Sequence, residues 1–100
     1  MDRLTALLKQ TMSEYTGEAL NGYSYLTSSE DQQLFTVVSV GHVRGKRIVE
    51  TGLIARVIGG QVVIERDVND KPLVDALVQN GIHREQIVLA YAGEVVPELS

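Results

Sequence analysis

The Gly59-Gly60 pair constrains the fold of this chain more than any other feature of its sequence. Two consecutive glycines between alternating apolar and polar residues are typical of a type I′ hairpin turn, because both central residues of that turn need positive φ. Closing the turn gives a ladder of pairs: Ile58 with Gln61, Val57 with Val62, Ala55 with Ile64 and Leu53 with Arg66. One face of this hairpin is then apolar. It collects Leu53, Ala55, Val57, Val62 and Ile64.

A second glycine turn precedes the first one in the chain. Arg44-Gly45-Lys46-Arg47 has glycine at its first central position, as a two-residue type II′ turn requires. Closing this turn gives the pairs Val43 with Ile48, Val40 with Thr51 and Val38 with Leu53. Both turns direct the same apolar set to the same face, so together they predict an antiparallel meander. The strand that leads into this second turn is expected over 33–40, and one further strand, over 22–27, precedes it across a polar turn.

The chain opens with an amphipathic segment, residues 2–15. Its apolar positions recur with a 3.6-residue period, which predicts a helix lying on the sheet. They are Leu4, Leu7, Leu8, Thr11, Met12 and Tyr15. Asp2 is the expected N-cap and Gly17 the expected stop.

A second helix is predicted over about 70–80, with Asn69 or Asp70 as its cap, Pro72 in its first turn and Gly81 just past its end. The apolar run 87–91 predicts a buried interior strand, and 94–100 a short tail. The expected fold is therefore α+β: an N-terminal helix, a four-stranded antiparallel meander, a helix and a final strand. Its 100 residues predict a single domain, 1–100.

Charge and composition exclude several functions. The net charge of −4 disfavours direct nucleic-acid binding, and the absence of cysteine excludes thiolate chemistry. No apolar run approaches the length of a membrane helix, and the N-terminus lacks the pattern of a signal peptide, so a cytoplasmic location is expected. The glycines belong to hairpins rather than to phosphate loops, so no cofactor is predicted.

Few residues offer chemistry. Glu65 and Asp67, at alternate positions of one strand, are expected on one face, and with His42 they form the candidate set for a small acid/base enzyme. A sheet rim and a helix cap explain these carboxylates as well. We therefore expect a non-enzymatic protein that acts by binding a partner.

Two surfaces are candidates for binding. The face of the meander opposite the core is more apolar than solvent favours, so it is the candidate interface. Its residues are Ile54, Arg56, Ile58, Val63 and Glu65. Either the opening helix or another chain covers this face. The other chain is a companion protein or a second copy of this one. Arg44, Lys46 and Arg47 form a basic hairpin tip, and DNA binding through it is expected to be weak.

Residues 62–91 resemble the XisI-like family, the controlling factors of fdxN-element excision in cyanobacteria. They read as a strand, an acidic cap, a helix ending in Leu77-Val78-x-x-Gly81-Ile82 and the strand Ile87-Val88-Leu89. Upstream, 38–42 is similar to the family's strand ending in Val-Gly-Trp, with Arg47 as the arginine that follows. This chain has His42 where the family commonly has Trp.

The resemblance covers nearly the whole chain and implies a regulator of programmed DNA rearrangement. It implies a companion, an XisH-like protein, while the recombinase is a separate protein. The family has no assigned catalytic residues, so none are carried over to this chain.

Overall fold

The computed structural model describes residues 2–97 and contains one six-stranded sheet with strand order β1-β2-β3-β4-β5-β6. The first five strands are antiparallel neighbours, whereas β6 runs parallel to β5. In chain order the elements are α1 (Arg3–Ser13), β1 (Gly17–Ala19), β2 (Gly22–Ser28), β3 (Leu34–Val43), β4 (Lys46–Ile58), β5 (Gln61–Asp67), α2 (Leu73–Gln79) and β6 (Ile87–Leu89). Short 3₁₀ turns span Arg84–Gln86 and Ala90–Ala92. The α+β class is confirmed, but the sheet has one strand more than the sequence predicts.

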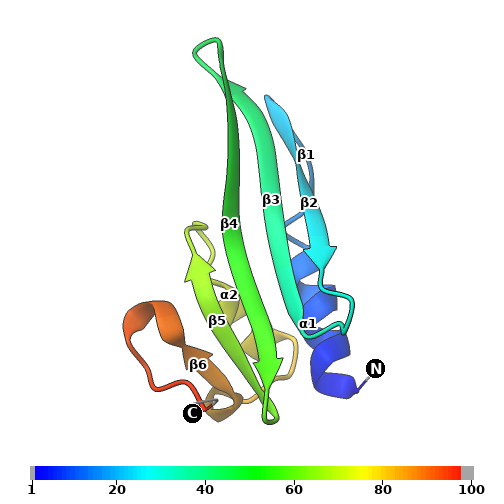
Figure 1. Ribbon diagram of the computed structural model, residues 1–100, viewed down its shortest axis with the longest axis vertical. Helices are drawn as coiled ribbons and strands as arrows, with labels where there is room; N and C mark the ends of the chain where they lie inside the picture. The colour runs from blue at the N-terminus through cyan, green and yellow to red at the C-terminus, as the bar shows by residue number, and fades with distance from the viewer. Residues whose placement is uncertain (1, 98–100) are drawn as a thin grey trace.

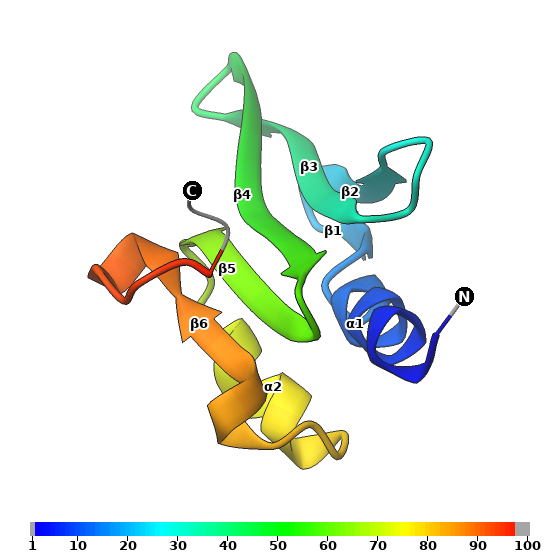
Figure 2. The same cartoon turned by 60° about the horizontal axis from the view of Figure 1, so that its bottom comes forward.

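Both helices pack on the same face of the sheet, at one end of the molecule (Figures 1 and 2). The core lies between them and the strands β3, β4 and β5. It is aliphatic apart from one phenylalanine and one methionine. Its buried members are Leu8, Met12, Phe35, Val37, Leu53, Ala55, Val57, Val62, Ile64, Leu73, Leu77, Ile82 and Ile87. The long hairpin of β3 and β4 and the short strands β1 and β2 extend beyond the helices, so half of the sheet has no helix on it (Figure 1).

The first helix begins as predicted and ends two residues early. The Asp2 carboxylate accepts the Thr5 backbone N–H at 2.7 Å, which confirms Asp2 as the N-cap. The helix ends at Ser13, and Gly17, at φ 121°, begins the extra strand β1 instead of stopping the helix. Tyr15 leaves the helix to donate its hydroxyl to the Lys71 carbonyl at 2.9 Å.

The Gly59-Gly60 turn is confirmed, with φ of 55° and 78° and Ile58 paired to Gln61. The predicted turn at Gly45 is wrong in register. Arg44 and Gly45 are the two central residues, at φ 52° and 78°, so Val43 pairs with Lys46 instead of Ile48. A type I′ turn fits the right-handed twist of the two strands. It needs positive φ at both central residues, so Arg44 adopts a backbone conformation that residues other than glycine rarely adopt.

Two β-bulges change the register along β4. On the β3 side Val37 pairs with Leu53 and Val38 with Thr51, so Gly52 is left without a partner. On the β5 side Ile54 pairs with Arg66 and Ala55 with Ile64, so Glu65 is the extra residue. The misplaced turn makes two predicted pairs wrong, because Val40 pairs with Val49 instead of Thr51 and Val38 with Thr51 instead of Leu53. The bulge at Glu65 makes the third wrong, because Leu53 pairs with Asp67 instead of Arg66. Because each bulge inserts one residue, it also reverses which face the following side chains occupy.

The second helix is shorter than predicted at its start. It begins at Leu73 with Pro72 in the N-cap position, and neither Asn69 nor Asp70 caps it. The end is as predicted: Gly81 has φ 103° and the Ile82 N–H bonds the Leu77 carbonyl at 3.0 Å, which is a Schellman motif.

The last strand is an edge strand of three residues rather than the predicted interior strand 87–91. Its apolar run reflects burial on both faces: Ile87 belongs to the core, while Val88 pairs with Val63 on the other face and is also buried. After Leu89 the chain turns away, and Tyr91 is exposed. Of the predicted tail 94–100, residues 98–100 lie outside the described residues.

Replacing Gly60 by valine is expected to lower the free energy of unfolding by about 1 kcal/mol or more, because a β-branched residue resists positive φ. No atom lies within 4 Å of the added Cβ, so the loss isolates backbone strain from packing. Urea denaturation measures it. Gly60→Asn is the control and should lose less, since asparagine tolerates this region. Equal stability of Gly60→Val and the parent would contradict the turn.

Candidate interaction surface

The three candidate acid/base groups do not come together. His42 pairs with Arg47 near the hairpin tip, whereas Asp67 pairs with Leu53, six residues further along β4. At about 3.3 Å per residue this is about 20 Å along the sheet. His42 is exposed. A joint site of the kind that proton transfer requires is therefore not formed by these groups.

The two carboxylates of this set lie on opposite faces, contrary to the prediction. The bulge at Glu65 is the cause, because the extra residue reverses the alternation between Glu65 and Asp67. Glu65 forms an ion pair with Arg56, with Nε and Oε2 2.7 Å apart. Asp67 lies opposite Leu53, on the face that carries the helices.

Asp67 organises the connection from β5 to α2. Its Oδ2 accepts the Leu73 N–H at 2.6 Å, and its Oδ1 accepts the backbone and side-chain N–H groups of Asn69 at 3.0 and 2.9 Å. Burial raises the pKa of the nearby Tyr15 to about 12, with contributions from the charges of Asp67 and Glu14. The Tyr15 hydroxyl thus stays protonated and donates to Lys71. Asp67 is a cap for the helix α2.

Metal and membrane sites receive no support from the geometry. Among residues 2–97, no three His, Asp or Glu side chains are grouped as metal ligands. No helix in this part of the chain has the length and apolar character needed to cross a bilayer.

The candidate interface lies on the face of the sheet that carries neither helix (Figure 2). The opening helix packs on the other face, so it does not cover this surface. Ile54, Arg56, Ile58 and Glu65 are half-buried here. Val63 is fully buried and therefore adds nothing to a free surface. The segment after β6 contacts β5, the strand that carries Val63.

The same face continues along the free half of the sheet, where it becomes more apolar. We define the outer face as the side chains of Tyr23, Tyr25, Val38, Val40 and Val49. Tyr23 pairs with Val40 and Tyr25 with Val38, and the two tyrosine rings lie 4.6 Å apart. Tyr25 is 51% exposed and Val49 54%. Neighbouring exposed aromatic and aliphatic side chains of this kind are typical of an interface.

Sequence reasoning missed the outer face because it stopped at the better-defined hairpin. The alternation of large apolar residues with serine in two neighbouring strands could have indicated this face. Tyr23-Ser24-Tyr25 pairs with Val38-Ser39-Val40 across the two antiparallel strands. The serines of both segments then point to the opposite face, where their hydroxyls share a hydrogen bond at 2.8 Å.

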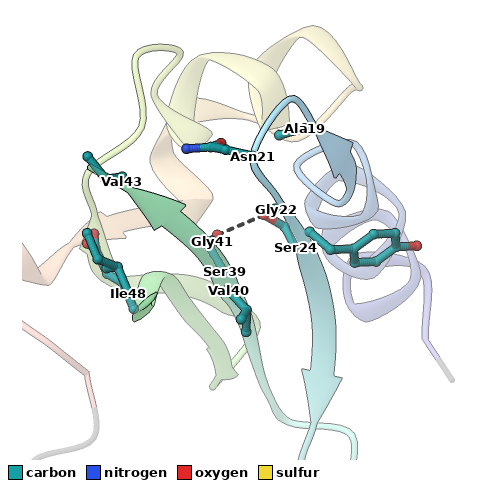
Figure 3. A pocket seen from close by; sticks show the side chains of 11 residues that line it. Ala19, Asn21, Gly22, Ser24, Ser39, Val40, Gly41, Val43 and Ile48 are labelled. Carbon is teal, nitrogen blue, oxygen red and sulfur yellow. Dashed lines mark hydrogen bonds between the residues drawn. The ribbon is translucent and has the colours of Figure 1, made fainter. Parts of the chain in front are cut away.

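That opposite face carries a shallow groove of about 270 Å³ beyond the helices (Figure 3). Small residues form its floor, namely Gly22, Ser24, Ser39 and Gly41, while Val43 and Ile48 lie on one side of it. The groove exists because side chains are minimal where β2 meets β3.

The basic residues lie where the sequence places them, at the end of the long hairpin of β3 and β4 (Figure 1). Arg44, Lys46 and Arg47 are all exposed. Strand alternation directs Lys46 and Arg47 to opposite faces, so the three cations do not form one flat patch. Weak DNA binding through them stays a prediction.

Comparison with known proteins gives consistent results for fold and family. A structure of a XisI-like protein from Anabaena variabilis is similar to this chain with a TM-score of 0.64 and 20% identity, covering 86% of this chain and 78% of that one. The fdxN element excision controlling factor XisI from the same organism gives a TM-score of 0.54 and 19% identity, covering 94% and 84%. At this identity the two structures support the fold alone. None of the curated proteins matches the chain.

The family is decided by the sequence model of the family described as XisI protein. It matches residues 1–99, which is nearly the full length of the chain. This chain belongs to the XisI family.

Proposed function

We propose that this protein is a non-enzymatic accessory factor in the control of DNA-element excision, and that it acts by binding a companion protein through its outer face. The companion we propose is XisH-like, as the family resemblance implies. The support is the membership of this chain in the XisI family, of which a protein of similar fold is described as an fdxN element excision controlling factor.

The observation that carries the proposal is the uncovered outer face. Both helices pack on the other side of the sheet, so the two tyrosines and their valine neighbours have no cover within the described chain. Tyrosine gives a large contact area at a low entropy cost, and buried tyrosines are common among the residues that dominate binding energy.

The experiment is co-purification of the tagged protein with its XisH-like companion, followed by titration calorimetry. Tyr25→Lys is expected to weaken binding at least about tenfold, because it places a charge in a desolvated contact. The fold should be retained, since the Tyr25 ring is half-exposed and, among residues 2–97, no hydrogen bond of its hydroxyl contributes to the fold.

Val78→Lys is the matched control, because Val78 is 45% exposed on α2, on the other side of the molecule. It should bind like the parent. Parental affinity of a folded Tyr25→Lys variant, or no complex at all with the companion, would refute the proposal.

A further inference from the structure

Strand β4 is longer than its neighbour β5, and this difference leaves a free strand edge. β5 pairs with β4 only from Leu53 to Ile58, while β4 begins at Lys46. Within the described chain, the edge from Lys46 to Glu50 faces no strand on that side. All five of its residues are exposed, among them Ile48 at 42% and Val49 at 54%.

The hairpin geometry determines which backbone groups this edge offers. In a two-residue hairpin the residues that flank the turn, here Val43 and Lys46, exchange hydrogen bonds with each other. The alternation of an antiparallel ladder then directs the N–H and C=O of Ile48 toward β3 as well. Those of Arg47 and Val49 point outward, away from β3. An unpaired row of this kind is a template for another strand.

We propose that a second copy of this chain pairs with this edge, antiparallel, about a two-fold axis at Ile48. Arg47 and Val49 of the two copies exchange four backbone hydrogen bonds in this register. The pairs without hydrogen bonds, in which side chains approach most closely, are Ile48 with Ile48 and Lys46 with Glu50 of the second copy. By symmetry the opposite charges meet twice.

Charge complementarity selects this register over its neighbours. A two-fold axis perpendicular to the sheet requires that one residue face its own copy, so the alternatives shift by single residues. An axis at Arg47 sets Arg against Arg, and an axis at Glu50 sets Glu against Glu. An axis at Val49 leaves the Lys46 charge beside Gly52 and sets Ile48 against Glu50. Of these four registers, only the one with its axis at Ile48 places Lys46 opposite Glu50 of the second copy and the two Ile48 side chains against each other.

The shape of the molecule agrees with this arrangement. β5 ends opposite the middle of β4, and within the described residues no strand lies beside the stretch of β4 from Lys46 to Glu50 (Figure 1). The molecule extends over 43 Å along this direction, against 27 and 25 Å across it. The contact uses a strand edge, whereas the proposed companion binds a sheet face. Loss of dimerisation by charge reversal is thus measured separately from loss of the companion.

Charge reversal tests the register. Sedimentation velocity from about 1 to about 500 μM should show the parent dimerising. Glu50→Lys alone should weaken the dimer about tenfold, because two attractive pairs become repulsive. The double variant Lys46→Glu/Glu50→Lys should regain most of the loss, since the opposite charges are restored. A monomeric parent over this range, or a double variant as weak as the single one, overturns the proposal.

A proline tests the backbone bonds. Val49→Pro removes an outward N–H and leaves the bonds to β3 in place, so it should keep the monomer folded and abolish the dimer. Circular dichroism monitors the fold. A folded Val49→Pro variant that dimerises like the parent overturns the proposal, and if this variant unfolds, the charge-reversal pair decides alone.

Discussion

Replacing Gly22 by alanine is expected to lower the free energy of unfolding by about 3 kcal/mol. Gly22 faces Gly41 across β2 and β3, and the strands approach so closely there that a Cβ on Gly22 would lie 2.1 Å from the Val40 carbonyl oxygen and 2.7 Å from the Gly41 Cα. Both are backbone atoms, so no side-chain rotation relieves the overlap. The strand must move or the pairing must break.

Gly41→Ala is the matched control, because it adds the same methyl group at the same cross-strand pair. Its Cβ would meet the Asn21 carbonyl oxygen at 3.1 Å, a contact that a shift of a few tenths of an ångström relieves. The control should therefore lose about 1 kcal/mol or less. Urea denaturation of the three proteins gives the comparison. Equal losses for the two variants would show that β2 and β3 do not approach each other as described.

The same close approach shapes the surfaces on both sides of the sheet. On one side it leaves the floor of the groove bare (Figure 3). On the other side it places Tyr23 against Val40 in the outer face. A variant that shifts β2 is therefore expected to affect companion binding as well, which is why Tyr25→Lys rather than Gly22→Ala tests the interface.

Local turn chemistry explains what the sequence predicts well and where it fails. At Gly59-Gly60 the sequence predicts the turn type correctly, because two consecutive glycines both accept the positive φ of a type I′ turn. At Gly45 a single glycine is compatible with either of two registers, and the sequence pattern favours the wrong one. Arg44 adopts φ 52°, a conformation that cannot be predicted from an arginine in the sequence, because positive φ is uncommon for residues other than glycine. Strand pairing decides this turn.

The bulges are the feature that sequence reasoning could least supply. Gly52 is consistent with one, since glycine in a strand interior often marks a bulge, but Glu65 has no such signature. A bulge depends on how two strands pack on the helices, which is tertiary information. The missed bulge at Glu65 accounts for the error in the candidate site, because it separates Glu65 from Asp67.

The edge position of β6 could not be predicted from the sequence for a related reason. A continuous apolar run indicates burial on both faces of a strand, and Ile87 and Val88 are indeed buried. Burial on both faces does not require a neighbour on both edges. Here the core covers one face, and the segment that includes Ala90–Ala92 contacts β5 beside it.

Replacing Asp67 by alanine is expected to lower the free energy of unfolding by about 2–3 kcal/mol, which distinguishes a structural cap from a catalytic acid. The carboxylate accepts three hydrogen bonds, of which two come from the backbone of Asn69 and Leu73. Hydrogen bonds to a charged group contribute more than neutral ones, and the Leu73 N–H is partly buried, so its loss is not fully replaced by water.

Asp67→Asn and Asp70→Ala complete the experiment. The amide keeps one acceptor oxygen but presents an N–H₂ group to one of its donors, so Asp67→Asn should lie between the parent and Asp67→Ala. Asp70 is an exposed carboxylate of the same loop, and Asp70→Ala should change stability by no more than about 0.5 kcal/mol. Urea denaturation of the four proteins orders them. An Asp67→Ala variant as stable as Asp70→Ala would mean that these bonds do not hold the start of α2, and the question of a chemical role for Asp67 would then reopen.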